Sequence, residues 1–298
     1  MKTVSKSALQ SPLASFTLSI LILFGVLGCN KPAFIKEWQN FDDLETAANK
    51  GDTDSQFRLG MRYTNGHGVV QDHATAVNWF KKAAQSGHNE AQFMLGAALH
   101  SGRGIEKSRS QSISWYTKSA EAGHMRSQYQ LGSAYLNGRG VTQDRAWGAR
   151  WYGMSASQGH KEAQFYLGAL YSKGLGLPKS KSKSLFWLRA SQLAGFTPAI
   201  KALKKLKLEV SDSQYATAIA KASNWKPSTK LIGLNNRPTL VYIQHMLNQL
   251  GYSAGFPDGI RGPNTAQAMS TFQSDRGLKS SSLQITLRQL RKESPGLN

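Results

Sequence analysis

The middle of the chain repeats one residue pattern every 36 positions. Glycine, glutamine and leucine residues keep this spacing together with a tryptophan that occurs four times, as Trp79, Trp115, Trp151 and Trp187. A fixed period of this size is the sequence signature of a solenoid, in which neighbouring units bury a continuous core between them. Stacked helical repeats present extended surfaces to other molecules, so the pattern favours an all-α protein that binds partners.

Each repeat is predicted to contain two helices separated by a short glycine loop. In the first unit, apolar residues of 54–65 recur at helical spacing, and Gly66 interrupts that helix. Asp72 is a suitable N-cap for a second helix that carries Trp79, and Gly87 follows its expected end. The same arrangement recurs in four units, which span residues 47–82, 83–118, 119–154 and 155–190.

These units resemble the Sel1-like repeat, a relative of the tetratricopeptide repeat with a longer loop. The matching motifs are an alanine-rich opening, an Ala-Gln-x-x-Leu-Gly core and an aromatic pair, as in Ala83-Ala84-x-x-Gly87, Ala91-Gln92-x-x-Leu95-Gly96 and Trp115-Tyr116. The resemblance implies an α/α solenoid of four repeats with a C-terminal cap, spanning residues 47–206, that holds protein partners. A further helix, with Ser211 as its expected N-cap, and a linker are predicted over 207–236.

Positions that are the same in every unit are expected to serve packing. Gly60 and its equivalents should let the second helix cross close to the first, with the tryptophans filling the core between them. Positions that vary between units are released from this constraint. On the first helices these positions form a stripe that we expect on the concave side of the solenoid, as a groove that binds a protein. We name it the A-helix stripe, and its residues are Arg58, Arg62, Met94, Arg126, Gln130 and Tyr166. A solvated face without a partner is the alternative for this stripe.

Residues 1–28 have the pattern of a secretory signal. Two lysines precede an apolar stretch, 16–27, that is shorter than the roughly 17–25 residues of a membrane span. Cys29, the only cysteine, follows directly, and the segment resembles the precursor of a bacterial lipoprotein. The resemblance implies lipidation of Cys29, a tether over 29–46 and, because Asn30 follows instead of Asp, anchoring at the periplasmic face of the outer membrane. An ordinary signal peptide or a buried thiol is the alternative.

Residues 237–292 carry a different pattern, with helical spacing of apolar residues on both sides of a glycine-containing loop and a short last helix expected over 286–290. The segment resembles the three-helix peptidoglycan-binding domain, on the motifs Leu250-Gly251-Tyr252, Asp258-Gly259-x-x-Gly262, Thr265, Ala268 and Phe272-Gln273. The resemblance implies contacts to a glycan or peptide stem from Tyr252, Asp258, Arg261, Asn264 and Gln273. Asp258 should organise the loop by accepting bonds from backbone amides. A scaffold that no longer binds cell wall is the alternative.

The sequence contains no motif of an enzyme, and it predicts neither a cofactor nor a metal site. His88, His124 and His160 recur one repeat apart, which is too far apart for shared metal ligands. Lys and Arg number 37 against 17 for Asp and Glu, a net charge of +20 that favours anionic partners such as cell wall. Nucleic acid is not expected as a partner, because the signal segment directs the chain out of the cytosol.

Taken together, these patterns predict a non-catalytic lipoprotein of the cell envelope. Its C-terminal domain would bind peptidoglycan and its solenoid would bind one or more envelope proteins, so that the chain acts as an adaptor. A regulatory subunit that modulates a peptidoglycan hydrolase or synthase is the alternative function. A factor that interacts with a host is a further, less favoured alternative.

Overall fold

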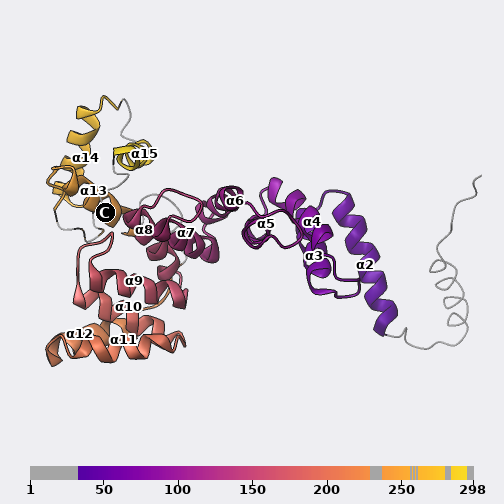
Figure 1. The fold of residues 1–298 in the computed structure, drawn as a ribbon, viewed down its shortest axis with the longest axis horizontal. Helices are drawn as coiled ribbons and strands as arrows, with labels where there is room; N and C mark the ends of the chain where they lie inside the picture. Colours follow the sequence, from indigo (N-terminus) through magenta and orange to yellow (C-terminus); the bar gives the residue numbers. More distant parts are fainter. Residues whose placement is uncertain are drawn as a thin grey trace, which may run out of the picture.

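The computed structural model describes residues 33–228, 237–255, 257, 259, 261–278 and 283–293, and these residues form helices and connecting loops without any strand. This observation confirms the predicted all-α fold. Figure 1 labels the helices, which are α2 (Ala33–Asn49), α3 (Thr53–Asn65), α4 (His73–Gln85), α5 (Asn89–Ser101), α6 (Arg109–Glu121), α7 (Met125–Asn137), α8 (Arg145–Ser157), α9 (Lys161–Lys173), α10 (Lys181–Leu193), α11 (Pro198–Lys207), α12 (Asp212–Ser223), α13 (Arg237–Gln249), α14 (Pro263–Asp275) and α15 (Leu283–Glu293).

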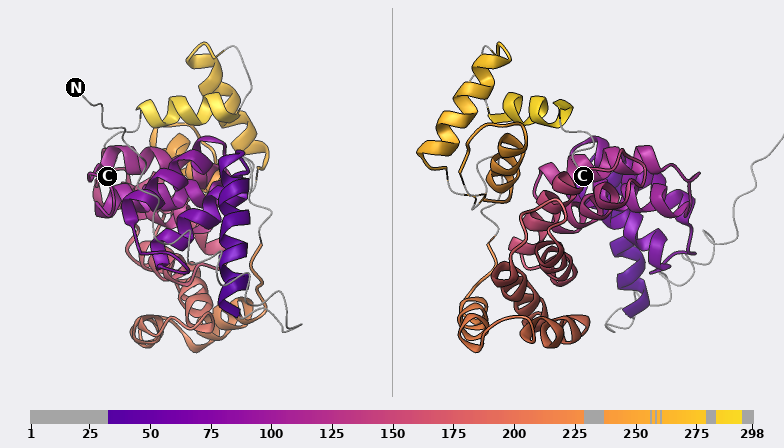
Figure 2. Two further views of the ribbon diagram at one scale, coloured as in Figure 1. Left: turned by 90° about the vertical axis from the view of Figure 1, so that its right-hand side faces the viewer. Right: turned by 60° about the vertical axis from the view of Figure 1, so that its left-hand side comes forward.

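Helices α2 to α12 stack side by side into one curved solenoid. In Figure 1, α2 lies at one end of the stack and α11 and α12 lie at the other. Each repeat is a helical hairpin made of α3 and α4, α5 and α6, α7 and α8, or α9 and α10, and each hairpin packs against the next. The right-hand view of Figure 2 shows the curvature that this stacking produces.

Glycines in the first helix of each repeat permit a close crossing of the second helix. A Cβ atom on Gly132 would lie only 2.6 Å from Cδ1 of Tyr152, so the ring occupies the space that a side chain would need. The prediction that these glycines serve close crossing is therefore confirmed. The residue that fills the contact is, however, the one after each tryptophan, here Tyr152; of the tryptophans, Trp79 and Trp151 are buried and Trp115 and Trp187 are half-buried. Consecutive helical residues point about 100° apart, which turns the tryptophans towards another face.

The glutamine that recurs in each repeat connects the first helix of that repeat to the end of the preceding helix. Nε2 of Gln128 donates to the carbonyl oxygen of Ala120 at 3.1 Å, and thereby gives a partner to a carbonyl in the last turn of the preceding helix. The equivalent glutamines make the same bond at 3.1–3.2 Å in the other repeats. Loop glycines make a second contact between neighbouring repeats. A Cβ on Gly104 would lie 2.2 Å from the carbonyl oxygen of His73 in the preceding repeat, so only a glycine lets the loop pack this closely.

Both ends of the solenoid are covered by additional helices. Residues 33–49 fall largely within the predicted tether but form α2, in which Phe41 and Ala48 pack with Leu59 of the first repeat. The physical reason is that a terminal repeat exposes an apolar face that needs a cover. At the other end, α12 packs against α10 and begins with a capping box formed by Ser211 and Gln214, so the predicted cap at Ser211 is confirmed.

After α12 the chain turns back along the solenoid. The backbone N–H of Ser228 donates to the carbonyl oxygen of Ser157 at 2.9 Å, which holds the returning segment against the end of α8. Helix α13 then packs against α8, in the third repeat, and α14 and α15 pack on α13 (Figure 1). The last of these helices covers residues 283–293 and is longer than the predicted 286–290. We refer to α13–α15 with their loops as the C-terminal module.

The substitution Gly132→Ala tests the helix crossing. Overpacking against Tyr152 costs about 3 kcal/mol at its upper range, whereas the gain in helix propensity is about 1 kcal/mol. We therefore expect a net loss of about 2 kcal/mol in the free energy of unfolding, measured by urea denaturation. Gln130→Ala, two residues earlier on α7, is the control and should change stability by about 0.5 kcal/mol or less. A free energy of unfolding equal to that of the wild type in Gly132→Ala would contradict the close contact between Gly132 and Tyr152.

Candidate functional site

The second helix of the third repeat, α8, has an outer face unlike that of its equivalents. Trp147 and Gly153 stand at positions that carry polar residues in every other repeat, namely Thr75, Gln111 and Lys183 for the first, and Lys81, Thr117 and Arg189 for the second. All residues from Ala146 to Ala156 are buried. A Cβ on Gly153 would lie 3.0 Å from Cβ of Pro238, so α13 packs directly on this face.

A buried arginine occupies the centre of this contact. The guanidinium carbon of Arg150 lies 4.3 Å from the ring centroid of Trp147 and 4.4 Å from that of Trp151. Its Nε donates to Oγ1 of Thr239, on α13, at 2.9 Å. Burial lowers the pKa of Arg150 to about 9, so the group is still charged at neutral pH. Cation–π attraction, worth about 2 kcal/mol in a desolvated site, offsets part of the hydration that Arg150 has lost.

The C-terminal module encloses Trp147 from two further directions. The ring of Tyr242 meets it edge-on at a centroid distance of 5.1 Å, and the guanidinium carbon of Arg291 lies 4.1 Å from its centroid. Nη2 of Arg291 also donates to the hydroxyl of Tyr135, on α7, at 3.2 Å. We name Trp147, Arg150, Trp151, Tyr242 and Arg291 the docking cluster. Through this cluster the repeats and the C-terminal module share one continuous apolar core.

Two polar residues on α13 hold the loop that carries the predicted wall-binding residues. Oε1 of the buried Gln244 accepts from the backbone N–H of Gly259 at 2.8 Å, and its Nε2 donates to Oγ1 of Thr265 at 2.9 Å. One turn later, Nδ2 of Asn248 donates to the carbonyl oxygen of Gly255 at 2.7 Å. Sequence analysis missed both residues. Two polar side chains spaced i, i+4 among the apolar residues of a helix are the signal that could have found them.

This loop exposes some of the predicted residues and is itself anchored to the solenoid. Arg261 and Asn264 are exposed, while Asp258 lies outside the described residues. Pro257 is buried, and its carbonyl oxygen accepts from Nζ of Lys183, on α10, at 3.2 Å. This bond links the loop to the fourth repeat, while Arg261 in the loop and Asn264 in the first turn of α14 face solvent.

The other two predicted wall-binding residues have partners within the module. The hydroxyl of Tyr252 donates to Oδ2 of Asp275 at 2.8 Å, and Arg276 donates to the same hydroxyl. The side-chain amide of Gln273 donates to the hydroxyl of Thr286 and so joins α14 to α15. These bonds give Tyr252 and Gln273 a structural role. Their contact with a glycan stays a prediction.

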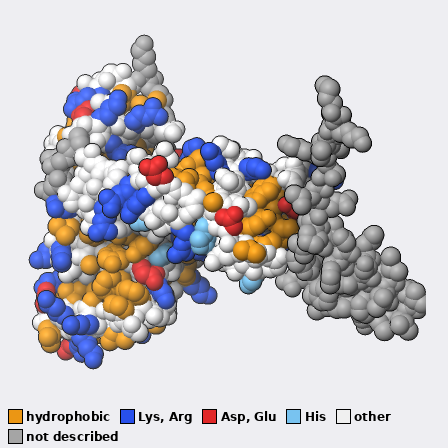
Figure 3. Space-filling view, turned by 45° about the vertical axis from the view of Figure 1, so that its right-hand side comes forward, with side chains coloured by type: hydrophobic (Ala, Val, Ile, Leu, Met, Phe, Trp, Pro, Cys, Tyr) orange, Lys and Arg blue, Asp and Glu red, His pale blue; other side chains and the backbone are white. Residues whose placement is uncertain are grey.

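The A-helix stripe is distributed between exposed and partly buried side chains. Arg58, Arg126 and Tyr166 are exposed, and Arg62, Met94 and Gln130 are half-buried. Met94 packs against the core, so only part of its side chain faces outwards. Nη2 of Arg126 lies 3.6 Å from Oε1 of Glu90 on the neighbouring first helix. Figure 3 shows abundant Lys and Arg over the described surface and few acidic side chains. The assignment of this stripe to a partner stays a prediction.

The recurring histidines cap helices. Nδ1 of His88, His124 and His160 accepts from a backbone N–H in the first turn of the following helix at 3.1, 3.2 and 3.4 Å. The other ring nitrogen of His124, Nε2, pairs with Oε2 of Glu90 at 2.8 Å. Burial lowers the pKa of His124, although Glu90 opposes that change, and burial likewise lowers the pKa of His160. The neutral ring is the form that can accept the capping bond.

The described part of the chain contains neither a metal-binding cluster nor a candidate membrane span. No group of three or more His, Cys, Asp or Glu side chains there could hold a metal ion. None of the described helices has the length and apolar character needed to cross a bilayer. Cys29, the predicted lipidation site, lies outside the described residues.

Fold and site define a helical-repeat binding protein with a small helical module docked on its third repeat. Family models agree: residues 53–88, 89–124, 126–160 and 161–191 match the Sel1 repeat. Residues 236–281 match the model described as "Putative peptidoglycan binding domain". Among solved structures, the chain is 30% identical to a Sel1 repeat protein from Oxalobacter formigenes, with a TM-score of 0.55, covering 70% of this chain and 86% of the other. The chain therefore belongs to the Sel1 repeat family.

A second similar structure is a protective antigen present in uropathogenic Escherichia coli strains, which displays the Sel1-like repeat fold. Identity is 27% and the TM-score is 0.57, over 86% of this chain. The present chain covers 56% of the length of that antigen. Comparison with curated proteins finds no match.

The substitution Trp147→Ala tests the docking cluster. Removing a buried tryptophan costs about 3–5 kcal/mol, and here the loss falls on the contact with α13 and α15. We expect unfolding in urea, followed by tryptophan fluorescence, to separate into two steps as the C-terminal module loses its support. Gln111→Ala is the matched control, because Gln111 is exposed at the equivalent position of the second repeat. A single wild-type transition in Trp147→Ala would contradict the proposed docking.

Acidification tests the histidine caps. Because the folded-state pKa of His124 lies below its ordinary value of 6.5, the unfolded chain binds more protons in this range. The capping contribution should be fully present above about pH 6.5 and decrease as the pH falls below it. His124→Asn keeps a good N-cap without titrating, so its melting temperature should fall less between pH 7.5 and 5.5. His67→Asn, in an exposed loop, is the control; an unchanged pH profile in His124→Asn would refute the cap's role.

Proposed function

We propose that this protein is a non-catalytic adaptor of the bacterial cell envelope that binds peptidoglycan through its C-terminal module and a protein partner through its repeats. The match of residues 236–281 to a peptidoglycan-binding family is the observation that carries the proposal. The exposed Arg261 and Asn264 support it, because they present a cationic donor and an amide to solvent from the end of a loop held by buried hydrogen bonds and from the first turn of α14. Such groups suit the carboxylates and acetamido groups of cell wall.

Docking of the module on α8 supports a scaffolding role. Arg150 and Trp147 hold the module against the third repeat, so the wall-binding loop and the A-helix stripe belong to one continuous structure. A partner on the stripe would then be kept at a set distance and orientation from the wall. A module on a long flexible linker would impose no such geometry.

We also propose that lipidation of Cys29 anchors the chain to the outer membrane, facing the periplasm. The sole cysteine directly after an apolar signal-like stretch supports this step. The similar antigen from uropathogenic Escherichia coli is described as protective, which favours an envelope setting for the present chain as well. Loss of residues 1–28, with Lys2 and Lys6, would lower the net charge from +20 to +18. This positive charge adds attraction to anionic wall and membrane surfaces, and the contribution should weaken with salt.

Co-sedimentation with purified sacculi tests peptidoglycan binding. We expect the chain from residue 33 onwards to pellet with sacculi at about 0.15 M salt, where the Debye length is about 8 Å. The double substitution Arg261→Ala and Asn264→Ala should lower the pelleted fraction about tenfold, equivalent to about 1.4 kcal/mol. Arg103→Ala, at an exposed position in a repeat loop, is the control for charge. Equal pelleting of wild type and the double variant would exclude this loop as the binding site.

A further inference from the structure

A cavity of about 640 Å³ lies where the solenoid, α12 and the C-terminal module meet. Its walls come from α8, α9 and α10 of the repeats, from α12 and from the first turns of α13. It is separate from the A-helix stripe and from Arg261 and Asn264, none of which lines it. Pockets of roughly 300–1,000 Å³ are the size that encloses small organic ligands.

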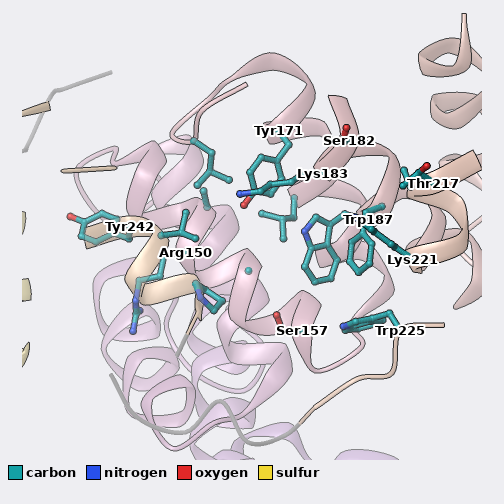
Figure 4. A pocket seen from close by; sticks show the side chains of 18 of the residues that line it. Arg150, Ser157, Tyr171, Ser182, Lys183, Trp187, Thr217, Lys221, Trp225 and Tyr242 are labelled. Carbon is teal, nitrogen blue, oxygen red and sulfur yellow. The ribbon is translucent and has the colours of Figure 1, made fainter. Parts of the chain in front are cut away.

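Aromatic rings form one wall of this cavity. Trp187 and Trp225 meet at a centroid distance of 5.5 Å, and Phe186 lies 5.0 Å from Trp187, with all three rings edge to face. Figure 4 shows both indoles on one side of the cavity. Trp225 and Trp187 are only half-buried, so parts of their rings are open to the cavity. Flat apolar surfaces of this kind stack against flat, weakly polar faces of a ligand.

The remaining lining carries positive charge and neutral hydrogen-bonding groups. Lys183, which also donates to Pro257, lies beside Tyr171 in Figure 4, and the exposed Lys221 lies on the tryptophan side. Hydroxyl and amide groups complete the lining, from Ser157, Ser182, Ser213, Gln214 and Thr217. Among the described residues that line the cavity, none is acidic. Figure 4 also shows the polar ends of Arg150 and Tyr242 turned away from the cavity, towards the docking cluster.

These features select a ligand that has flat apolar faces, polar edges and a negative charge. We propose that the cavity binds a disaccharide-peptide fragment of peptidoglycan, with sugar rings against Trp187 and Trp225 and a carboxylate against Lys221. Acetamido and hydroxyl edges of the sugars would meet the hydroxyl and amide groups of the lining. The inference rests on the proposed function for a wall setting, but it assigns a second site at different residues.

A ligand in this cavity would touch repeats and C-terminal module at once. Val241 and Tyr242 of α13 line it together with Leu167 and Tyr171 of α9. A bound fragment would therefore bridge the repeats and the C-terminal module, and its binding free energy would stabilise their docked arrangement. The cavity would sense soluble wall fragments, whereas the exposed loop engages intact wall.

Titration calorimetry of the full chain with N-acetylglucosaminyl-N-acetylmuramyl dipeptide tests the proposal. We expect one site per chain, and Lys221→Glu should raise Kd at least about tenfold, because it sets a carboxylate against the ligand's carboxylate. Lys204→Glu, on the exposed side of α11, is the matched control and should leave Kd unchanged. Neutral di-N-acetylchitobiose should bind about tenfold more weakly than the charged probe, since it lacks the carboxylate.

Three results would overturn the cavity site: no binding at about 1 mM probe, an unchanged Kd in Lys221→Glu, or equally tight binding of octanoate, which has the charge without the sugar rings. Sacculi separate this failure from that of the proposed function. If wild type and Lys221→Glu pellet alike while the probe does not bind, the cavity inference fails and wall binding stands. If the probe binds in the cavity while sacculi are not pelleted, the loop-mediated function fails instead.

Discussion

Burial of the outer face of α8 is the constraint on which the arrangement of the molecule depends. At the positions of Trp147 and Gly153, the other repeats carry lysine, threonine, glutamine or arginine, which can meet water. In the third repeat this face carries Trp147, Arg150 and Gly153, and leaving this apolar surface exposed would cost roughly 25 cal/mol per Å². Covering it with α13 and α15 brings the chain back from the end of the solenoid to its middle. The same contact buries the charge of Arg150, which the two flanking indoles and Thr239 compensate.

Around this contact, the repeats use one set of joints many times. Glutamine side chains close the end of one helix, histidine rings begin the next, and loop glycines pack against the preceding unit. Because each joint links neighbours only, the solenoid gains stability unit by unit and leaves one edge of every first helix available. That edge is where the variable residues Arg58, Arg126 and Tyr166 are exposed. Packing therefore accounts for the recurring residues, and the variable ones are left for recognition.

Three possible recognition surfaces then occupy distinct places on one body. The A-helix stripe belongs to the repeats, the loop with Arg261 and Asn264 belongs to the C-terminal module, and the aromatic and cationic cavity lies where the two meet. The predicted wall contacts fall into two groups, because Tyr252 already bonds to α14 and Gln273 already joins α14 to α15. Under the proposed function, the protein would bind cell wall at one place and hold a partner at another. The docking cluster sets the geometry between them.

The sequence by itself determined the all-α class, the 36-residue repeat, the helix crossing at Gly132 and the cap at Ser211, because each depends on neighbours within one or two repeats. It did not identify Tyr152 as the residue in that crossing, since a single period does not give the rotation of a helix. It also missed the polar clamps of Gln244 and Asn248, whose partners appear only when the loop folds over α13. Only the tertiary structure decided that the C-terminal module docks on α8 and creates a cavity there. That contact joins residues almost 90 positions apart, as in Arg150 and Thr239, and no local pattern specifies such a pairing.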